Sequence, residues 1–368
     1  MKIGLFGVAG FNRGDDAIAA GIVDWVTTRH PNARITLAVL RHQCEPPLGH
    51  LAQLMIDRRS PGGLRRLIAG VREQDVVLIG GGSLIQDKHG GGRWRGVLGY
   101  AWTVTALARL FGKPILAIGL GIDELGSAGG KAAAREVLGR IDWLSVRDQR
   151  SASEALALGR ERGEITVGPD PAFAFPQSNL PSGGGDYIVL SPAMENVGEQ
   201  HIAALFAKLA SAISSAHPDL GIKIVAMDER AAEDAGKLAL ITACLPAGEA
   251  SRVELVVPAN AEEAATLLRG ARGIIAMRLH ALILGYGFTR LYCISRTTKT
   301  DALMQEYEIA GGTLADDPEA LVAGALSSLI DNDRFGRQQT LRDDVMARGE
   351  VMRDVLGMAI AKLGRPTR

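Results

Sequence analysis

The chain has 368 residues, of which 47% are hydrophobic and 22% charged, a balance typical of a globular protein with more than one domain. Its 41 Lys and Arg equal its 41 Asp and Glu, so net charge gives no reason to expect nucleic acid as a partner. Three scattered cysteines, Cys44, Cys244 and Cys293, indicate neither a disulfide framework nor a zinc site, and they favour a reducing, cytoplasmic compartment.

The first half of the chain alternates short apolar runs with amphipathic stretches. This alternation predicts a parallel β-sheet with crossover helices, and near-continuous apolar strands indicate burial on both faces. The opening run reads as a strand rather than a signal peptide, and no apolar run reaches the roughly 18 residues of a membrane span. The predicted strands are Ile3–Val8, Ile35–Leu40, Val76–Ile79, Ile115–Ile118, Trp143–Val146 and Ile165–Val167.

A segment rich in Pro, Ser and Gly, Pro176–Asp186, predicts a linker, after which the alternation restarts. The tail from Pro318 to Leu363 predicts helices with a break near Asp331–Asp333. We therefore expect an α/β protein with two Rossmann-like domains, at residues 1–175 and 187–335, followed by a helical segment at 336–368. The second set of predicted strands is Tyr187–Leu190, Ile222–Ala226, Val253–Val256, Gly273–Ala276 and Leu291–Ile294.

Two glycine-containing segments follow predicted strands, where ligands bind in open α/β sheets. In GVAGFNRGDDA, the glycines allow a tight turn and Asp15 and Asp16 either cap a helix or accept a sugar hydroxyl. In IGGGSLIQD, three glycines (Gly80, Gly81 and Gly82) would expose backbone N–H groups to an anion or a sugar, and Ser83 adds a hydroxyl. Neither spacing is that of a dinucleotide fingerprint or a Walker A loop.

Two further segments place cationic side chains after strands. Arg147 follows one strand and could hold a carboxylate or phosphate with its planar fork, or it could belong to a helix cap with Asp148. Arg278 and His280 flank Leu279 in a short turn, where His280 is either a core histidine or a proton donor beside a cation. The sequence holds no metal-ligand cluster and no nucleophile elbow, so we expect no metal and no hydrolase chemistry of those types.

In order and spacing, these segments resemble the polysaccharide pyruvyl transferase family. The resemblance covers roughly residues 1–300 and includes a lysine after the next strand, Lys299. The elements that carry it are NRGDDA at Asn12–Ala17, GGGSLIQD at Gly80–Asp87, VRDQRS at Val146–Ser151, DPAF at Asp170–Phe173 and RLHALI at Arg278–Ile283.

The resemblance implies a glycosyltransferase B-like fold with the site between the domains and phosphoenolpyruvate as donor, without a further cofactor. It implies donor binding by Arg278, Leu279, Arg147 and Lys299, with His280 and one of Asp15 and Asp16 in catalysis. It also implies that the acceptor is contacted by Asn12, Gly80, Gly81, Gly82 and Ser83. A sugar or lipid-linked glycan would be the acceptor, in cell-surface polysaccharide biosynthesis at the inner face of the membrane, with peripheral membrane association and a homo-oligomer left open.

Two alternatives stay open from the sequence. A nucleotide-sugar-dependent glycosyltransferase of the same fold would also place cationic side chains on phosphates. A catalytically inactive relative could bind glycan without turnover. The GLGIDEL segment, with Asp123, departs from the pattern of many family members and leaves the acceptor less certain than the donor.

Overall fold

The computed structural model of the chain describes residues 1–7, 9–40, 42–56, 60–88, 92–176, 183–194, 198–227 and 231–364. Val8, the last residue of the first predicted strand, and residues 177–182 of the predicted linker lie outside them. The chain divides into two compact units: unit 1 contains residues 1–11, 15–176 and 345–368, and unit 2 contains residues 12–14 and 177–344.

Unit 1 is built on a seven-stranded, all-parallel sheet with the strand order β3-β2-β1-β4-β5-β6-β7. The order reverses between β1 and β4, which is the doubly wound arrangement of Rossmann-like folds. The central strands β1, β4 and β5 are apolar and buried along nearly their whole length, as expected for a sheet covered on both faces. The strands are β1 (Lys2–Phe6), β2 (Arg34–Val39), β3 (Ala52–Met55), β4 (Val76–Gly80), β5 (Ile115–Leu120), β6 (Trp143–Val146) and β7 (Ile165–Val167).

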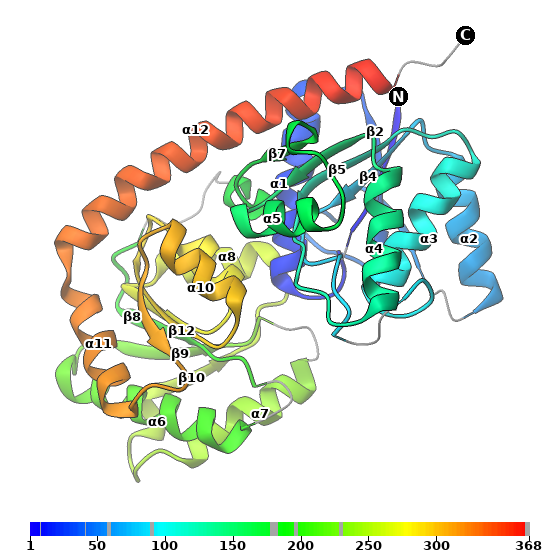
Figure 1. The fold of residues 1–368 in the computed structure, drawn as a ribbon. Coiled ribbons are helices and arrows are strands. Elements are labelled where there is room, and N and C mark those ends of the chain that lie inside the picture. The colour runs from blue at the N-terminus through cyan, green and yellow to red at the C-terminus, as the bar shows by residue number, and fades with distance from the viewer. Residues whose placement is uncertain are drawn as a thin grey trace. The chain divides into compact units, whose positions relative to one another are not determined.

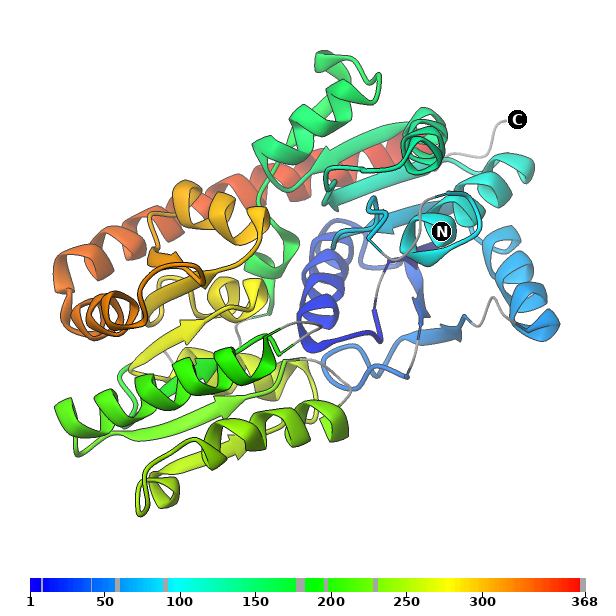
Figure 2. The same cartoon turned by 60° about the horizontal axis from the view of Figure 1, so that its bottom comes forward.

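Helices cover both faces of this sheet. Right-handed crossovers place α2, α3 and α4 on one face, where they lie side by side (Figures 1 and 2), and α1 on the other. The helices are α1 (Arg13–Arg29), α2 (Pro61–Arg72), α3 (Gly96–Leu110), α4 (Ala128–Arg140) and α5 (Gln149–Ala157), with the short 3₁₀ helices η1 (Arg162–Glu164) and η2 (Pro171–Ala174).

Unit 2 repeats the doubly wound plan with six parallel strands in the order β10-β9-β8-β11-β12-β13. Its strands are β8 (Tyr187–Ser191), β9 (Gly221–Val225), β10 (Val253–Val256), β11 (Gly273–Ala276), β12 (Arg290–Ser295) and β13 (Ala310–Thr313). Its helices are α6 (Glu199–Ala216), α7 (Ala231–Ala243), η3 (Ala250–Arg252), α8 (Ala261–Gly270), α9 (Leu279–Gly285), α10 (Thr298–Glu306) and α11 (Pro318–Ile330).

The last helix, α12 (Asn332–Leu363), contributes to both units. Its first part belongs to unit 2 and residues 345–368 belong to unit 1. There Met352 and Gly357 pack against Gly168 and Arg29, and the apolar side chains that α12 buries in unit 1 recur at helical spacing. They are Val345, Met352, Leu356 and Ile360.

The sequence predicted the sheet interiors and missed the short edge strands β3 and β13. The β3 segment AQLM is largely half-buried, and the β13 segment AGGT contains two glycines, which weaken any strand signal. Both strands form because a neighbouring strand offers its unpaired edge: Val39 pairs with Met55, and Cys293 pairs with Gly311.

Candidate functional site

The glycine segment after β4 forms a tight turn at the carboxyl edge of the unit 1 sheet. Gly81 and Gly82 have φ angles of +58° and +65°, in the left-handed region that favours glycine. A Cβ atom on Gly81 would lie 1.8 Å from Cγ2 of Ile18, so the turn packs directly on α1.

Some backbone groups of this turn are hydrogen-bonded to the segment that contains β5. The N–H of Gly81 donates to the carbonyl of Ile118 at 2.9 Å, and the carbonyl of Gly82 accepts from Gly121 at 2.9 Å. The expectation that all three glycine N–H groups face a ligand is therefore wrong for Gly81. Ser83, which follows, is half-buried, and its hydroxyl accepts a hydrogen bond from Arg147 at 3.2 Å.

Arg147 lies directly after β6, with a side chain only 6% exposed. Its Nη1 is 3.3 Å from Oδ2 of Asp170, and its Nε is 3.4 Å from Oδ2 of Asp148. Burial opposes the charge, but the carboxylates of Asp170, Asp148 and Asp123 outweigh it and raise the pKa of Arg147. The guanidinium is therefore a permanent cation that connects the turn after β4 to the segment after β7.

The structure shows the helix cap that the VRD segment could form. Asp148 is the N-cap of α5, and its Oδ1 accepts from the N–H of Ser151 at 2.6 Å. Sequence reasoning gave no role to Asp170 or Asp123, the other carboxylates around Arg147. Their signals were present, because Asp170 opens the DPAF segment and Asp123 follows β5, but only the fold brings them to one arginine.

Asp15 and Asp16, which the sequence alone could not distinguish, have different surroundings at the start of α1. Asp16 is 4% exposed, and its Oδ1 accepts from the N–H of Gly10 at 2.8 Å and from Sγ of Cys44 at 3.3 Å. Nε2 of His42 lies 3.7 Å from the other oxygen of Asp16. Asp16 therefore anchors the loop after β1. Asp15, its neighbour in the first turn of α1, is 9% exposed.

Residues 12–14, which include the predicted acceptor residue Asn12, group with unit 2 rather than unit 1. Arg13 donates its backbone N–H to Met227 at 3.1 Å and its Nε to the carbonyl of Pro258 at 3.0 Å. A Cβ atom on Gly14 would lie 2.2 Å from Nδ1 of His280. The glycine is thus required for the backbone to approach the imidazole ring.

In unit 2 the Arg-Leu-His turn joins β11 to α9. Arg278 is the N-cap residue of α9, and Arg278, Leu279 and His280 are all half-buried, whereas residues 281–285 are buried. Lys299 is half-buried in the first turn of α10, after β12. Because β11 and β12 are adjacent parallel strands, paired at Ala276 and Cys293, the two loops leave the same edge of the sheet.

The structure therefore brings the predicted residues together within each unit. In unit 1 the turn after β4 and Arg147 are in direct contact, and Asp15 and Asp16 open α1, on which that turn packs. In unit 2 Arg278, Leu279, His280 and Lys299 occupy neighbouring loops. Among the residues that the structure describes, no group of three or more His, Cys, Asp or Glu side chains could hold a metal ion.

Solved structures of similar architecture are glycosyltransferase B-like enzymes. UDP-GlcNAc 2-epimerase from Neisseria meningitidis, solved bound to UDP-GlcNAc, has a TM-score of 0.62 at 12% identity, covering 98% of this chain and all (100%) of the other. The Methanocaldococcus jannaschii UDP-GlcNAc 2-epimerase gives 0.62 at 14%, with coverage of 97% and 99%. ADP-heptose LPS heptosyltransferase II of E. coli gives 0.54 at 13%, with coverage of 90% and 100%. At identities this low, the structural similarity establishes the fold and nothing further.

The two parallel sheets with their helices thus define an α/β protein with two Rossmann-like units of glycosyltransferase B-like type. The sequence model of the polysaccharide pyruvyl transferase family matches residues 12–290, well over half of the chain. The chain belongs to the polysaccharide pyruvyl transferase family. No curated protein sequence matches it.

Proposed function

We propose that the protein transfers the pyruvyl group of phosphoenolpyruvate to two hydroxyls of a sugar, forming a cyclic ketal during polysaccharide biosynthesis. Family membership supports the class of reaction. The single structural observation that carries the donor assignment is the pair of neighbouring loops in unit 2. They supply two cationic side chains and an imidazole at one sheet edge, from Arg278, Lys299 and His280.

The donor carries a carboxylate and a phosphate on one enol, so its binding requires concentrated positive charge. Arg278 offers a planar fork for one of these anions, and Lys299 offers a point charge for the other. Arg147 supplies a third cation in this proposal. Because it is held by Asp170, Asp148 and Ser83, we assign it to ordering the turn after β4 as much as to contacting the donor.

The reaction requires one proton to be supplied and two to be removed. We propose that His280 protonates the terminal methylene of the enol, which leaves the central carbon oxocarbenium-like. A sugar hydroxyl attacks this carbon and loses its proton to a base. Phosphate then departs, and a second hydroxyl attacks the same carbon, loses its proton and closes the ketal. The cationic side chains stabilise the departing phosphate.

Asp15 is our candidate for the base. The carboxylate of Asp16 already accepts hydrogen bonds from Gly10 and Cys44, which suits an anchor better than a proton acceptor. Gly80, Gly82 and Ser83 remain the proposed acceptor contacts in unit 1, and Asn12 is the proposed acceptor contact in unit 2.

The test is an incubation of the purified chain with phosphoenolpyruvate and a panel of simple and lipid-linked glycosides. Phosphate release and product mass are recorded together. The expected product gains the mass of pyruvic acid less water, with one phosphate released per ketal. Parallel incubations with nucleotide-sugars test the rival glycosyltransferase reaction, because consumption of a nucleotide-sugar in place of phosphoenolpyruvate would refute the proposal. Glycan binding without turnover of either donor would indicate an inactive relative.

A further inference from the structure

Helix α3 is apolar on nearly all sides although it lies at the surface of unit 1. Arg109 is its one charged residue among 15. Leu98, Val104 and Ala108 face the sheet and are buried, whereas Leu110 is 74% exposed. A helix that is hydrophobic all round normally has an apolar environment on every side. The outer side of α3, where Trp102, Thr103 and Ala106 are half-buried, therefore calls for a partner.

The segment before α3 adds an exposed indole to this side. Trp94 is 78% exposed, and it and Leu110 are the two most exposed large hydrophobic side chains of the described residues. The backbone of Trp94 packs over Gly99, where an added Cβ would lie 2.8 Å from its carbonyl carbon. Its ring stacks against Trp102 with the centroids 5.3 Å apart and the planes tilted by 56°.

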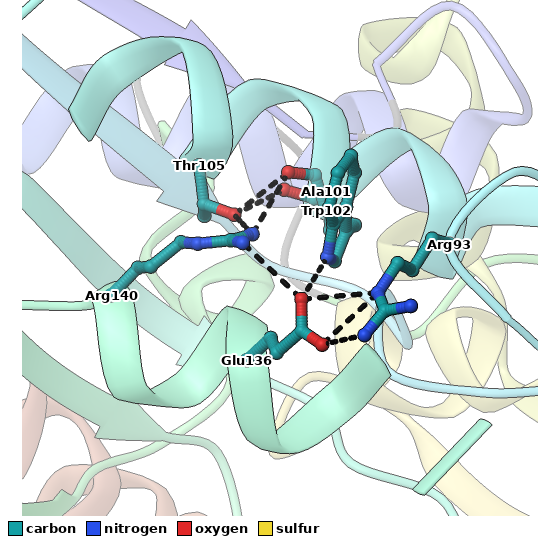
Figure 3. A network of polar contacts seen from close by, with 6 residues as sticks. All are labelled: Arg93, Ala101, Trp102, Thr105, Glu136 and Arg140. Carbon is teal, nitrogen blue, oxygen red and sulfur yellow. Dashed lines mark hydrogen bonds and ion pairs between the residues drawn. The ribbon is translucent and has the colours of Figure 1, made fainter. Parts of the chain in front are cut away.

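A polar network fixes the underlying ring of Trp102 (Figure 3). Its Nε1 donates to Glu136 at 2.7 Å, and the guanidinium of Arg140 lies 4.8 Å from the ring centroid. Nε of Arg93 donates to the same carboxylate at 3.0 Å. The exposed indole of Trp94 thus lies against a ring that polar contacts hold in place, and such an arrangement reduces the entropy lost on binding a partner.

Positive charge surrounds this apolar strip. Residues 61–113 contain eight Lys or Arg and three Asp or Glu, although the whole chain has no net charge. On α2, Arg65 and Arg72 are exposed and point away from the buried side formed by Leu67 and Val71. Arg93 pairs with Glu136 of α4, and Arg109 pairs with Asp142, which precedes β6. No described acid forms an ion pair with Arg65 or Arg72.

We propose that this surface, made by Trp94, Trp102, Ala106 and Leu110 with Arg65 and Arg72 and called here the α2–α3 face, docks on a bilayer containing anionic lipids. Indole and leucine side chains insert at the headgroup boundary, and arginines bind the negative surface. Helices α2 and α3 lie side by side (Figure 1), and Arg65 and Arg72 of α2 and Leu110 of α3 are on the exposed sides of these helices. No helix among the described residues could span a membrane, so the docking is peripheral.

Charge decides between a membrane and a second copy of the chain. A two-fold interface would bring together two surfaces that both carry excess positive charge. Anionic headgroups instead neutralise them. This inference goes beyond the proposed reaction and does not depend on it, because binding to lipid requires neither donor nor acceptor.

The experiment is vesicle flotation of the full chain, with vesicles of phosphatidylcholine alone and with vesicles of about three parts phosphatidylcholine to one part anionic phosphatidylglycerol, which carry a negative surface potential. We expect binding to the anionic vesicles only, weakened by salt. Removing two arginines, in Arg65→Gln/Arg72→Gln, should lower the partition coefficient roughly thirtyfold. Trp94→Ser/Leu110→Ser should lower it at least about tenfold.

The matched control is Ile330→Ser/Val351→Ser, which removes apolar side chains of similar exposure, 66% and 64%, outside the α2–α3 face. It should leave vesicle binding unchanged. Thermal unfolding checks that each variant folds. If Trp94→Ser/Leu110→Ser does not fold, tryptophan fluorescence replaces the flotation of that variant. We expect a blue shift of the emission when the wild-type chain binds vesicles, and loss of this shift in Trp94→Phe.

Two flotation results would overturn the inference: no binding of the wild-type chain to anionic vesicles, or an equal loss of vesicle binding in the control variant. Light scattering could also overturn it, by showing a dimer of the wild-type chain that Trp94→Ser/Leu110→Ser dissociates while vesicle binding persists. Flotation with intact binding and no pyruvyl transfer would refute the proposed function alone.

Discussion

Arg147 and Asp170 form a nearly fully buried ion pair in unit 1, with Nη1 3.3 Å from Oδ2 and side chains 6% and 5% exposed. The same guanidinium donates to the hydroxyl of Ser83. One cation therefore connects the turn after β4, the end of β6 and the start of η2. Gly121, whose N–H donates to the carbonyl of Gly82 in that turn, also lies against the guanidinium, since a Cβ atom on Gly121 would be 3.0 Å from Cζ of Arg147.

Asp170→Asn should destabilise the protein strongly. Breaking a buried pair costs up to about 3–5 kcal/mol, and here Asp148 and Asp123 remain near the guanidinium and offset part of that cost. Urea unfolding followed by circular dichroism measures the change. Asp354→Asn is the control, because it breaks the ion pair with Arg29 at the surface and should change stability little. Equal effects of the two substitutions would contradict the structural role of Arg147.

Gly81→Ala should destabilise more than Gly112→Ala. Both glycines have positive φ angles, +58° and +63°, so both substitutions carry a backbone strain of about 1–2 kcal/mol. Only Gly81 would also drive its Cβ into Ile18, which adds about 1–3 kcal/mol, whereas Gly112 has no neighbour within 4 Å. Unfolding free energies of the two variants test this, and similar values would show that the turn after β4 can move away from α1.

His280→Ala should lower turnover about a hundredfold or more, the usual scale for loss of an acid–base group. His201→Ala is the matched control, since His201 is exposed on α6 of the same unit. Phosphate release from phosphoenolpyruvate in the presence of an accepted glycoside is the measurement. A near-wild-type rate in His280→Ala would remove the imidazole from the mechanism.

The two adjacent acidic residues of α1 should respond differently to the same change. Asp16→Asn weakens the anchor to Gly10 and Cys44 and should cost about 1–3 kcal/mol of stability. Asp15→Asn should lower turnover about 10²–10⁴-fold, because it removes the proposed base. Thermal unfolding and the rate of phosphate release are measured for both variants. A loss of stability in Asp15→Asn together with a loss of turnover in Asp16→Asn would exchange the two proposed roles.

The Glu136 carboxylate should contribute acid-sensitive stability. Hydrogen bonds from Arg93 and Trp102 lower its pKa from 4.5 to about 2 (Figure 3). A lowered folded-state pKa means that the contribution is complete above pH 4.5 and is lost as the pH falls toward 2. The stability difference between the wild-type chain and Glu136→Gln should therefore shrink over that interval. Glu350→Gln, at an exposed site, is the control, and a pH-independent difference at Glu136 would contradict the lowered pKa.

Hydrophobic periodicity predicted two α/β units and the positions of their interior strands along the chain, because each interior strand is apolar along its length. It also predicted the break between α11 and α12, where Asp331 ends one helix and Asn332 begins the next. Hydrophobic periodicity did not predict the edge strands β3 and β13, because they are short and bury little apolar surface.

The residue types of the candidate site were readable from the sequence by themselves: glycines after β4, an arginine after β6, and an Arg-Leu-His turn after β11. Only the tertiary structure decided which partners they have. Arg147 meets Ser83 and Asp170, which lie 64 and 23 residues away along the chain, and the N–H of Gly81 is used by Ile118. Local patterns specify strands and turns because those depend on near neighbours. Ion pairs and hydrogen bonds between loops depend on which strands lie side by side, and sheet order is a property of the whole fold.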